Sequence, residues 1–161
     1  MARLLVVHHS PTDTVRRLTD AVVAGANDDA VEDVEVVVRP ALEAGAADVL
    51  AADGFVLGTT ANFGYMSGAL KHFFDTIFLE AGGALSDDGS AASGSGGRKP
   101  FGLYVHGRYD TTGAVRSVLA IVQALPWTQA AGVLEVVGEV DRHHEEAAYE
   151  LGGTLAALLS P

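Results

Sequence analysis

Three short polar stretches carry the residue types that can hold a ligand. The first is HSPTDT at 9–14, in which every second residue from the serine onward bears a hydroxyl. The second is TTANFG at 59–64, and the third is HGRYD at 106–110. A hydroxyl-rich turn that leads into a helix can seat a phosphate on its hydroxyls and backbone N–H groups. The first stretch therefore predicts an anion site.

Each polar stretch follows an apolar run and precedes a helical repeat. Strands are expected at Leu4–Val7, Val34–Val38, Gly54–Gly58, Lys99–His106 and Gly132–Val137. Helices are expected at Val15–Asn27, Ala41–Val49, Ser67–Phe78, Val115–Leu125 and His143–Leu159, with Ser67 as an N-cap and Pro126 as a stop. This alternation predicts a parallel sheet with helices on both faces. The polar stretches then lie at carboxyl ends of strands, where open α/β sheets bind ligands.

Composition narrows the function classes. The 161 residues, 48% of them hydrophobic, suit one domain spanning 1–161, with a flexible Gly/Ser-rich loop at 81–97. The net charge of −11 disfavours nucleic acid and anionic membranes as partners. The absence of cysteine excludes disulfides, thiolate catalysis and iron–sulfur clusters. With no signal-peptide core and no membrane-length apolar run, the expected compartment is the cytoplasm.

Other groupings of reactive residues are weaker evidence for a functional site. The pairs His8-His9 and His143-His144 point in different directions on a strand or helix, so no metal site is expected. Ser10, His106 and Asp110 could be written as a hydrolase triad, but the chain has no Gly-x-Ser-x-Gly elbow.

The segment GTTANFGYMSGALKHFFD, from Gly58 to Asp75, resembles the flavodoxin-like FMN proteins. It is most similar to the branch of NAD(P)H:quinone oxidoreductases of the tryptophan-repressor-binding-protein type and NADPH-dependent FMN reductases. The resemblance implies a flavodoxin-like doubly wound α/β fold, with a five-stranded parallel sheet in the order 2-1-3-4-5. In that order the three strands that carry the polar stretches are neighbours, so these stretches meet at one edge.

The resemblance also implies the ligand and the residues that hold it. The FMN phosphate would lie at the first stretch, and the flavin ring between the second and third. Backbone N–H groups at Asn62 to Gly64 could face the ring, and Phe63, Tyr65 and Tyr109 are candidate ring neighbours. The cofactor-binding residues are then Ser10, Pro11, Thr12, Asp13, Thr14 and Val15; Thr59, Thr60, Ala61, Asn62, Phe63 and Gly64; and His106, Gly107, Arg108, Tyr109 and Asp110.

The implied activity is an FMN-dependent oxidoreductase that passes electrons from NAD(P)H to a quinone-like acceptor. The flavin carries the chemistry, so no catalytic side chain is required. The alternative is a flavodoxin-like electron carrier without substrate turnover, which the acidity favours through docking on basic partners. Arg108 could meet a nicotinamide-cofactor phosphate or an acidic substrate, or be a plain surface arginine. A homodimer is expected, with Tyr65, Phe78 and Leu79 as possible contacts.

Asp13 departs from the family pattern, which has glycine at this position. A carboxylate that faces the phosphate would repel it, whereas one that caps the following helix would not. We expect the first arrangement, which would weaken FMN binding. A relative that has lost its flavin is the third functional possibility.

Overall fold

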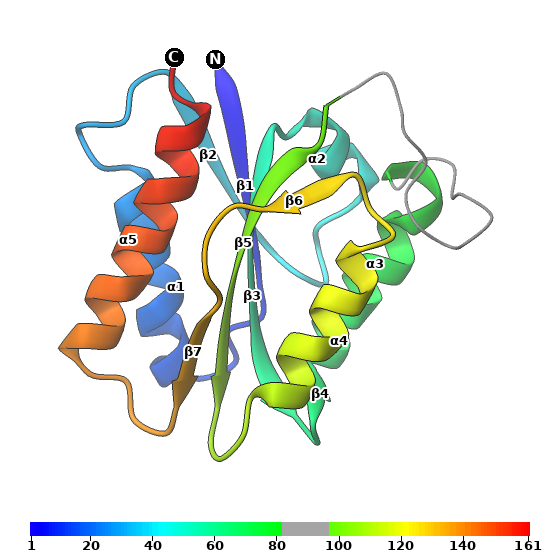
Figure 1. Ribbon diagram of the computed structural model, residues 1–161, viewed down its shortest axis with the longest axis vertical. Helices are drawn as coiled ribbons and strands as arrows, with labels where there is room; N and C mark the ends of the chain where they lie inside the picture. The colour runs from blue at the N-terminus through cyan, green and yellow to red at the C-terminus, as the bar shows by residue number, and fades with distance from the viewer. Residues whose placement is uncertain (82–96) are drawn as a thin grey trace.

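A central sheet with helices on both faces organises the chain, and the computed structural model describes residues 1–81 and 97–161 (Figure 1). The strands are β1 (Ala2–His8), β2 (Val34–Pro40), β3 (Gly54–Asn62), β4 (Tyr65–Met66), β5 (Lys99–Gly107), β6 (Trp127–Gln129) and β7 (Leu134–Val137). The helices are α1 (Asp13–Ala26), α2 (Ala46–Ala51), α3 (Gly68–Ala81), α4 (Thr112–Val122) and α5 (Arg142–Leu159). The predicted Gly/Ser-rich loop at 81–97 falls, apart from its two ends, outside the described residues.

The sheet confirms the predicted parallel order. Its path is β2-β1-β3-β5, after which β6 and β7 both pair with β5 in parallel. Helices α1 and α5 cover one face, and α2, α3 and α4 cover the other (Figure 1). The prediction placed a single fifth strand at this edge of the sheet. In the structure, the two short strands β6 and β7 fill that position beside β5. Among the strands of the described residues, only β4, at the end of β3, runs antiparallel to its partner.

The divided fifth strand corrects the predicted strand at Gly132–Val137. β6 pairs with Lys99–Phe101, and β7 pairs with Tyr104–Gly107, with a break between them. The sequence shows no alternation for β6 because this strand is only 3 residues long. Its first residue, Trp127, is buried and stacks on Phe55 with ring centroids 4.1 Å apart, and this packing holds β6 on the sheet.

Two helices are also shorter than predicted. α2 begins at Ala46 and not at Ala41, because Ala41 to Glu43 form a turn after Pro40. α4 ends at Val122, three residues before the expected end, and a turn leads from there to Pro126. No helix in the two described ranges is long and apolar enough to cross a membrane.

The central strands β1, β3 and β5 bury both faces, as their continuous apolar runs predict. In β1, Leu5 and Val7 face the layer under α2, α3 and α4, while Leu4 and Val6 face α1 and α5. All four side chains are fully buried. The two apolar layers fix the register of the central strands, because a slip by one residue would move each side chain to the opposite face.

Helices α1 and α5 cross at unusually close range, and glycine makes this possible. A Cβ atom on Gly152 would lie 1.9 Å from the carbonyl oxygen of Val22, and one on Gly25 would lie 1.9 Å from that of Tyr149. Gly153, the next residue, is less constrained, since its nearest atom would be the Gly25 carbonyl oxygen at 3.3 Å.

This crossing predicts opposite effects for two neighbouring substitutions. Gly152→Ala should lower the free energy of unfolding by about 1–3 kcal/mol, because the backbones of the two helices must separate. Gly153→Ala is the matched control and should be neutral or stabilise by up to about 1 kcal/mol through helix propensity. Urea denaturation of the protein measures both. Equal stabilities of the two variants would contradict the close crossing.

Candidate functional site

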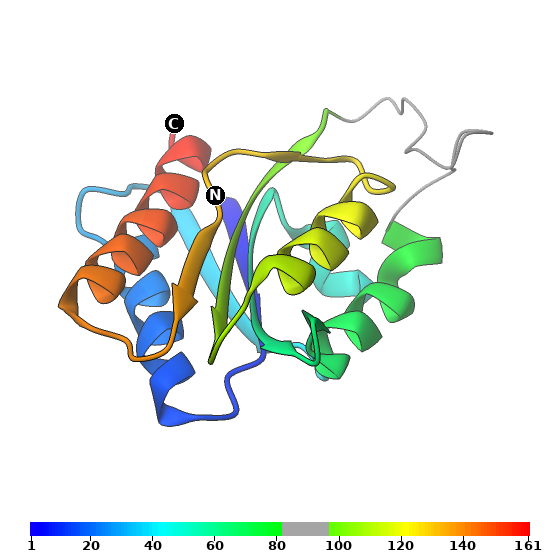
Figure 2. The same ribbon diagram turned by 60° about the horizontal axis from the view of Figure 1, so that its bottom comes forward.

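The three predicted polar stretches come together at the carboxyl edge of the sheet. β1, β3 and β5 are parallel neighbours, with His8 opposite Gly58 and Thr60 opposite His106. Their following turns all lie at the lower end of Figure 1, and Figure 2 brings this end forward. Two contacts tie the turns together. The His9 N–H donates to the Gly58 carbonyl at 3.0 Å, and Gly113 at the start of α4 packs against the backbone of Gly64.

In the turn between β1 and α1, two of the predicted hydroxyls already have protein partners. Ser10 Oγ lies 2.9 Å from His8 Nδ1 and 2.6 Å from Thr19 Oγ1. Thr12 is the N-cap of α1, and its Oγ1 accepts from the Val15 N–H at 3.3 Å. Thr14 is half-buried, and Pro11 is exposed at the tip of the turn.

Asp13 does not cap α1, so that alternative is wrong. It is the first residue of the helix, and its side chain is 95% exposed and pairs with Arg16 one turn later. Thr12 caps instead because its extended backbone places the hydroxyl over the first turn. The charge of Asp13 is thus balanced in part by Arg16, which reduces the repulsion that a nearby anion would feel.

The second stretch is mostly strand, which corrects the strand end expected at Gly58. β3 continues to Asn62, and Phe63 and Gly64 form a two-residue turn into β4. Polar side chains at buried strand positions look like a loop in the sequence. In the structure, Thr59 Oγ1 accepts from the Ser67 N–H at 3.0 Å, so its burial is compensated.

Ser67 has the predicted capping role. Its Oγ accepts from the Leu70 N–H at 3.2 Å at the start of α3. Thr60 is different from Thr59: it is 8% exposed, and its Oγ1 is the buried side-chain oxygen that finds no hydrogen-bond partner within the described residues. A buried hydroxyl without a partner is costly, so Thr60 carries an uncompensated polar group at the edge where the three turns meet.

The turn between β3 and β4 is strained and presents an aromatic ring to solvent. Both of its central residues have positive φ, 52° at Phe63 and 75° at Gly64. Glycine tolerates this conformation, whereas phenylalanine pays for it. The Phe63 ring is fully exposed, so burial does not compensate the strain. An exposed aromatic at a strained turn is a recurring feature of ligand sites.

The end of β5 is held by two hydrogen bonds. His106 donates through Nε2 to the carbonyl of Gly138, at 2.6 Å. Asp110 accepts from the Thr112 N–H at 2.9 Å, at the start of α4, and this bond lowers the pKa of Asp110. Both side chains thus have structural roles here. Arg108 and Tyr109 are exposed, and the guanidinium carbon lies 5.7 Å from the ring centroid.

The sequence interpretation missed Tyr104 and Thr19. Tyr104 is fully buried on the α1 and α5 face, and its hydroxyl lies 2.6 Å from Thr19 Oγ1. Burial raises the pKa of Tyr104 well above its ordinary value. A Cβ on Gly58 would lie 2.0 Å from Tyr104 Cζ, so Gly58 makes room for this ring. The apolar strand around Tyr104 gave no sign that its hydroxyl reaches toward Ser10.

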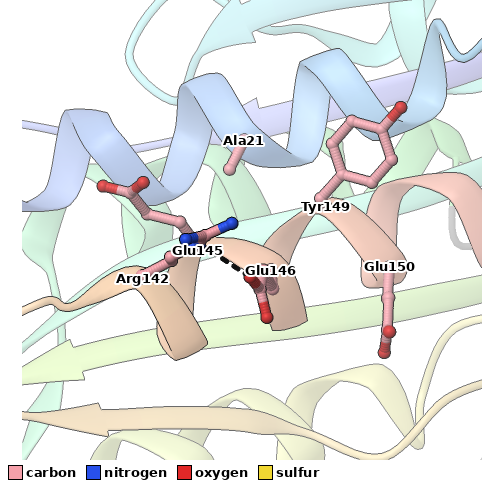
Figure 3. A pocket seen from close by; sticks show the side chains of 6 residues that line it. All are labelled: Ala21, Arg142, Glu145, Glu146, Tyr149 and Glu150. Carbon is pink, nitrogen blue, oxygen red and sulfur yellow. Dashed lines mark hydrogen bonds and ion pairs between the residues drawn. The ribbon is translucent and has the colours of Figure 1, made fainter.

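A hollow of about 470 Å³ lies away from this edge, on the outer side of α1 and α5 (Figure 3). It is lined by Ala21, Arg142, Glu145, Glu146, Tyr149 and Glu150, and Arg142 pairs with Glu146. Tyr149 extends toward α1 in Figure 3. The hollow contains none of the predicted site residues, and its three carboxylates suit neither a phosphate nor another anion.

Comparisons with known proteins agree with this architecture. No protein-family model matches the chain. A protein named flavodoxin from Aquifex aeolicus is 34% identical over 100 residues, which cover 60% of this chain. The match spans about half of that relative's length, 52%.

Two solved structures share the fold of this chain over nearly its whole length. An archaeal flavodoxin superposes with a TM-score of 0.76 at 14% identity, over 98% of each chain. A WrbA-like flavodoxin from Agrobacterium tumefaciens superposes with a TM-score of 0.67 at 18% identity, over 99% of this chain and 98% of its own. The predicted flavodoxin-like fold is therefore confirmed.

The strained turn yields a testable prediction. Phe63→Ala should change the free energy of unfolding by no more than about 0.5 kcal/mol, because the ring makes no buried contact. Phe63→Gly should be more stable than Phe63→Ala by about 1 kcal/mol, since glycine accepts a positive φ. Thermal and urea unfolding compare the two variants. Equal stabilities would mean that Phe63 does not have a left-handed backbone in solution.

Proposed function

We propose that this protein binds FMN at the carboxyl edge of its sheet and transfers electrons in the manner of a flavodoxin. The observation that carries the proposal is the meeting of three ligand-competent turns around Thr60, whose buried hydroxyl lacks a partner within the described residues. In an open α/β sheet this edge is where ligands bind.

The turn between β1 and α1 fits a phosphate. Thr12 Oγ1 accepts from Val15, so its own hydrogen is available to a ligand. The first N–H groups of a helix have no acceptor within the helix, which leaves those of Asp13 and Thr14 for an anion. The helix dipole favours the negative charge, and the pairing of Asp13 with Arg16 reduces the opposing repulsion.

The turns after β3 and β5 fit a flat, polar ring. Phe63 and Tyr109 expose aromatic surface in these two turns, and the backbone from Asn62 to Gly64 forms an exposed turn at the same edge. Bound FMN would supply redox chemistry, and the protein would supply placement and electrostatics. This division explains how the site could work without a catalytic acid, base or nucleophile.

An electron carrier is the better supported form of this function. The curated relative and the archaeal neighbour are both named flavodoxin. The net charge of −11 would steer the protein toward a basic redox partner. The cytoplasm remains the proposed compartment.

An NAD(P)H:quinone oxidoreductase is the second candidate. The WrbA-like neighbour and the residues from Gly58 to Asp75 favour it. In this case exposed Arg108 would be available to a phosphate of the nicotinamide cofactor. A homodimer could complete the site, because Tyr65 and Leu79 expose apolar surface and Phe78 is half-buried.

The role of Thr60 in ligand binding predicts opposite changes in stability and affinity. Wild-type protein reconstituted with FMN and desalted should keep about one FMN per chain. Thr60→Val should raise the free energy of unfolding without ligand by about 1 kcal/mol, because it removes an unpaired buried hydroxyl. It should also weaken FMN binding by about fivefold.

Thr60→Ser keeps the hydroxyl and is the control, with affinity close to that of the parent. Fluorescence quenching of FMN measures the affinity, and urea denaturation measures the stability. Wild-type protein that neither retains FMN nor quenches it would remove the proposed function.

Steady-state turnover separates the two candidate functions. The FMN-loaded protein is mixed with NADPH or NADH and benzoquinone, and free FMN at the same concentration is the reference. A carrier should oxidise the nicotinamide cofactor no faster than free FMN does, because it has no nicotinamide site. Faster oxidation that saturates with NADPH or NADH would establish the oxidoreductase.

A further inference from the structure

A series of polar side chains, half-buried at its outer end and buried at its inner end, leads from the proposed phosphate turn into the core. Its members, called here the polar relay, are His8, Ser10, Thr19 and Tyr104. His8 Nδ1 lies 2.9 Å from Ser10 Oγ, which lies 2.6 Å from Thr19 Oγ1, which lies 2.6 Å from the Tyr104 hydroxyl. The relay joins β1, α1 and β5, and phosphate binding by the turn does not itself require its inner members.

Tyr104 fixes the direction of these hydrogen bonds. It is fully buried, and burial keeps its hydroxyl protonated by raising the pKa. Thr19 Oγ1, at 2.6 Å, is the nearest acceptor for this hydroxyl, and Ser10, the next member of the relay, also acts on the pKa of Tyr104. If the phenol only accepted, its own hydrogen would be buried without an acceptor, which is unfavourable. Tyr104 therefore donates to Thr19.

This direction passes along the relay to Ser10. A hydroxyl has one hydrogen, and Thr19 lies between Tyr104 and Ser10. Since Thr19 accepts from Tyr104, its own hydrogen goes to Ser10. Ser10 in turn keeps one hydrogen, which can point inward to His8 Nδ1 or outward to the turn.

The protonation of His8 decides between these two directions. A neutral imidazole with a bare Nδ1 accepts the Ser10 hydrogen. A protonated His8 carries a hydrogen on Nδ1 and donates it to Ser10, so the Ser10 hydrogen is released outward. In that state the turn gains both a hydroxyl donor and a nearby positive charge.

Few charged groups act on His8. Burial lowers the pKa of His8, the neighbouring His9 lowers it further, and Asp20 of α1 opposes both effects. The residues paired with His8 on β2 and β3 are Pro40 and Gly58, which carry no charge. Without ligand, His8 is therefore neutral near pH 7, and Ser10 is free to point inward.

We propose that binding of a phosphate ester in the β1–α1 turn drives proton uptake by His8 through Ser10, with Tyr104 and Thr19 as positioning residues that set the direction of the relay. This inference rests on the proposed function and deepens it. It couples the affinity for the FMN phosphate to the protonation of a side chain that no ligand needs to touch.

The sign of the pH dependence follows from the charge. A phosphate dianion stabilises protonated His8, so the pKa of His8 is higher in the complex than in the free protein. Between these two pKa values, binding takes up a proton and affinity rises as the pH falls. One coupled proton changes the affinity by at most about tenfold per pH unit.

Isothermal titration calorimetry measures this uptake directly. FMN is titrated into the protein near pH 6.5 in two buffers of different ionisation enthalpy. The difference between the two observed binding enthalpies gives the number of protons that the complex takes up. His8→Asn keeps an amide close to Ser10 but cannot gain a proton. His72→Asn, at an exposed histidine of α3 on the opposite face of the sheet from Tyr104, is the matched control. The FMN phosphate itself titrates near this pH and contributes equally to the proton uptake of every variant. The difference in proton uptake between variants therefore measures the contribution of His8.

We expect wild type and His72→Asn to take up on the order of half a proton more than His8→Asn. Tyr104→Phe keeps the ring over Gly58 but removes the orienting hydroxyl, and its uptake should fall toward that of His8→Asn. Riboflavin, which has no phosphate, should show no uptake that depends on His8.

Three results would overturn the relay while FMN binding stands. These are equal uptake in wild type and His8→Asn, unchanged uptake in Tyr104→Phe, and the same His8-dependent uptake with riboflavin. A complete lack of FMN binding by the wild type would overturn the proposed function, and the relay with it.

Discussion

The parallel register of β1, β3 and β5 is the constraint on which the site depends. It sets His8 opposite Gly58 and Thr60 opposite His106, so the turns that follow these strands share one edge. The two apolar layers enforce this register, because a shift by one residue would expose buried side chains such as Leu5. A slip in β5 would also remove Tyr104 from the space over Gly58 and break its contact with Thr19.

The sequence predicted most of the fold because apolar runs and helical repeats are local signals. It missed β6, whose attachment depends on the packing of Trp127 against Phe55, and it ended β3 at Gly58, four residues too early. The buried Thr59 hydroxyl is compensated by Ser67, eight positions away, which no local pattern reveals. The site turns were predictable, but the partners of Ser10 were not, since the Tyr104–Thr19 contact joins residues 85 positions apart.

The proposed anion-binding edge lies apart from the acidic cluster on α5. Glu145, Glu146 and Glu150 lie on the outer side of α5, around the hollow in Figure 3, whereas the proposed phosphate turn offers hydroxyls and N–H groups. Asp13 is the one carboxylate inside that turn, and its exposure and its pairing with Arg16 limit its effect on a ligand. A negatively charged protein can therefore hold a negatively charged cofactor, because the local dipoles and donors outweigh the distant charges.

Amide chemical shifts on addition of FMN test the central claim most directly. In a ¹⁵N-labelled sample, the account predicts that the largest changes lie in residues 9–15, 59–64 and 106–111, with further changes at Thr19 and Tyr104. Changes centred on the α1–α5 hollow, or no changes at all, would contradict a flavin site at the carboxyl edge of the sheet.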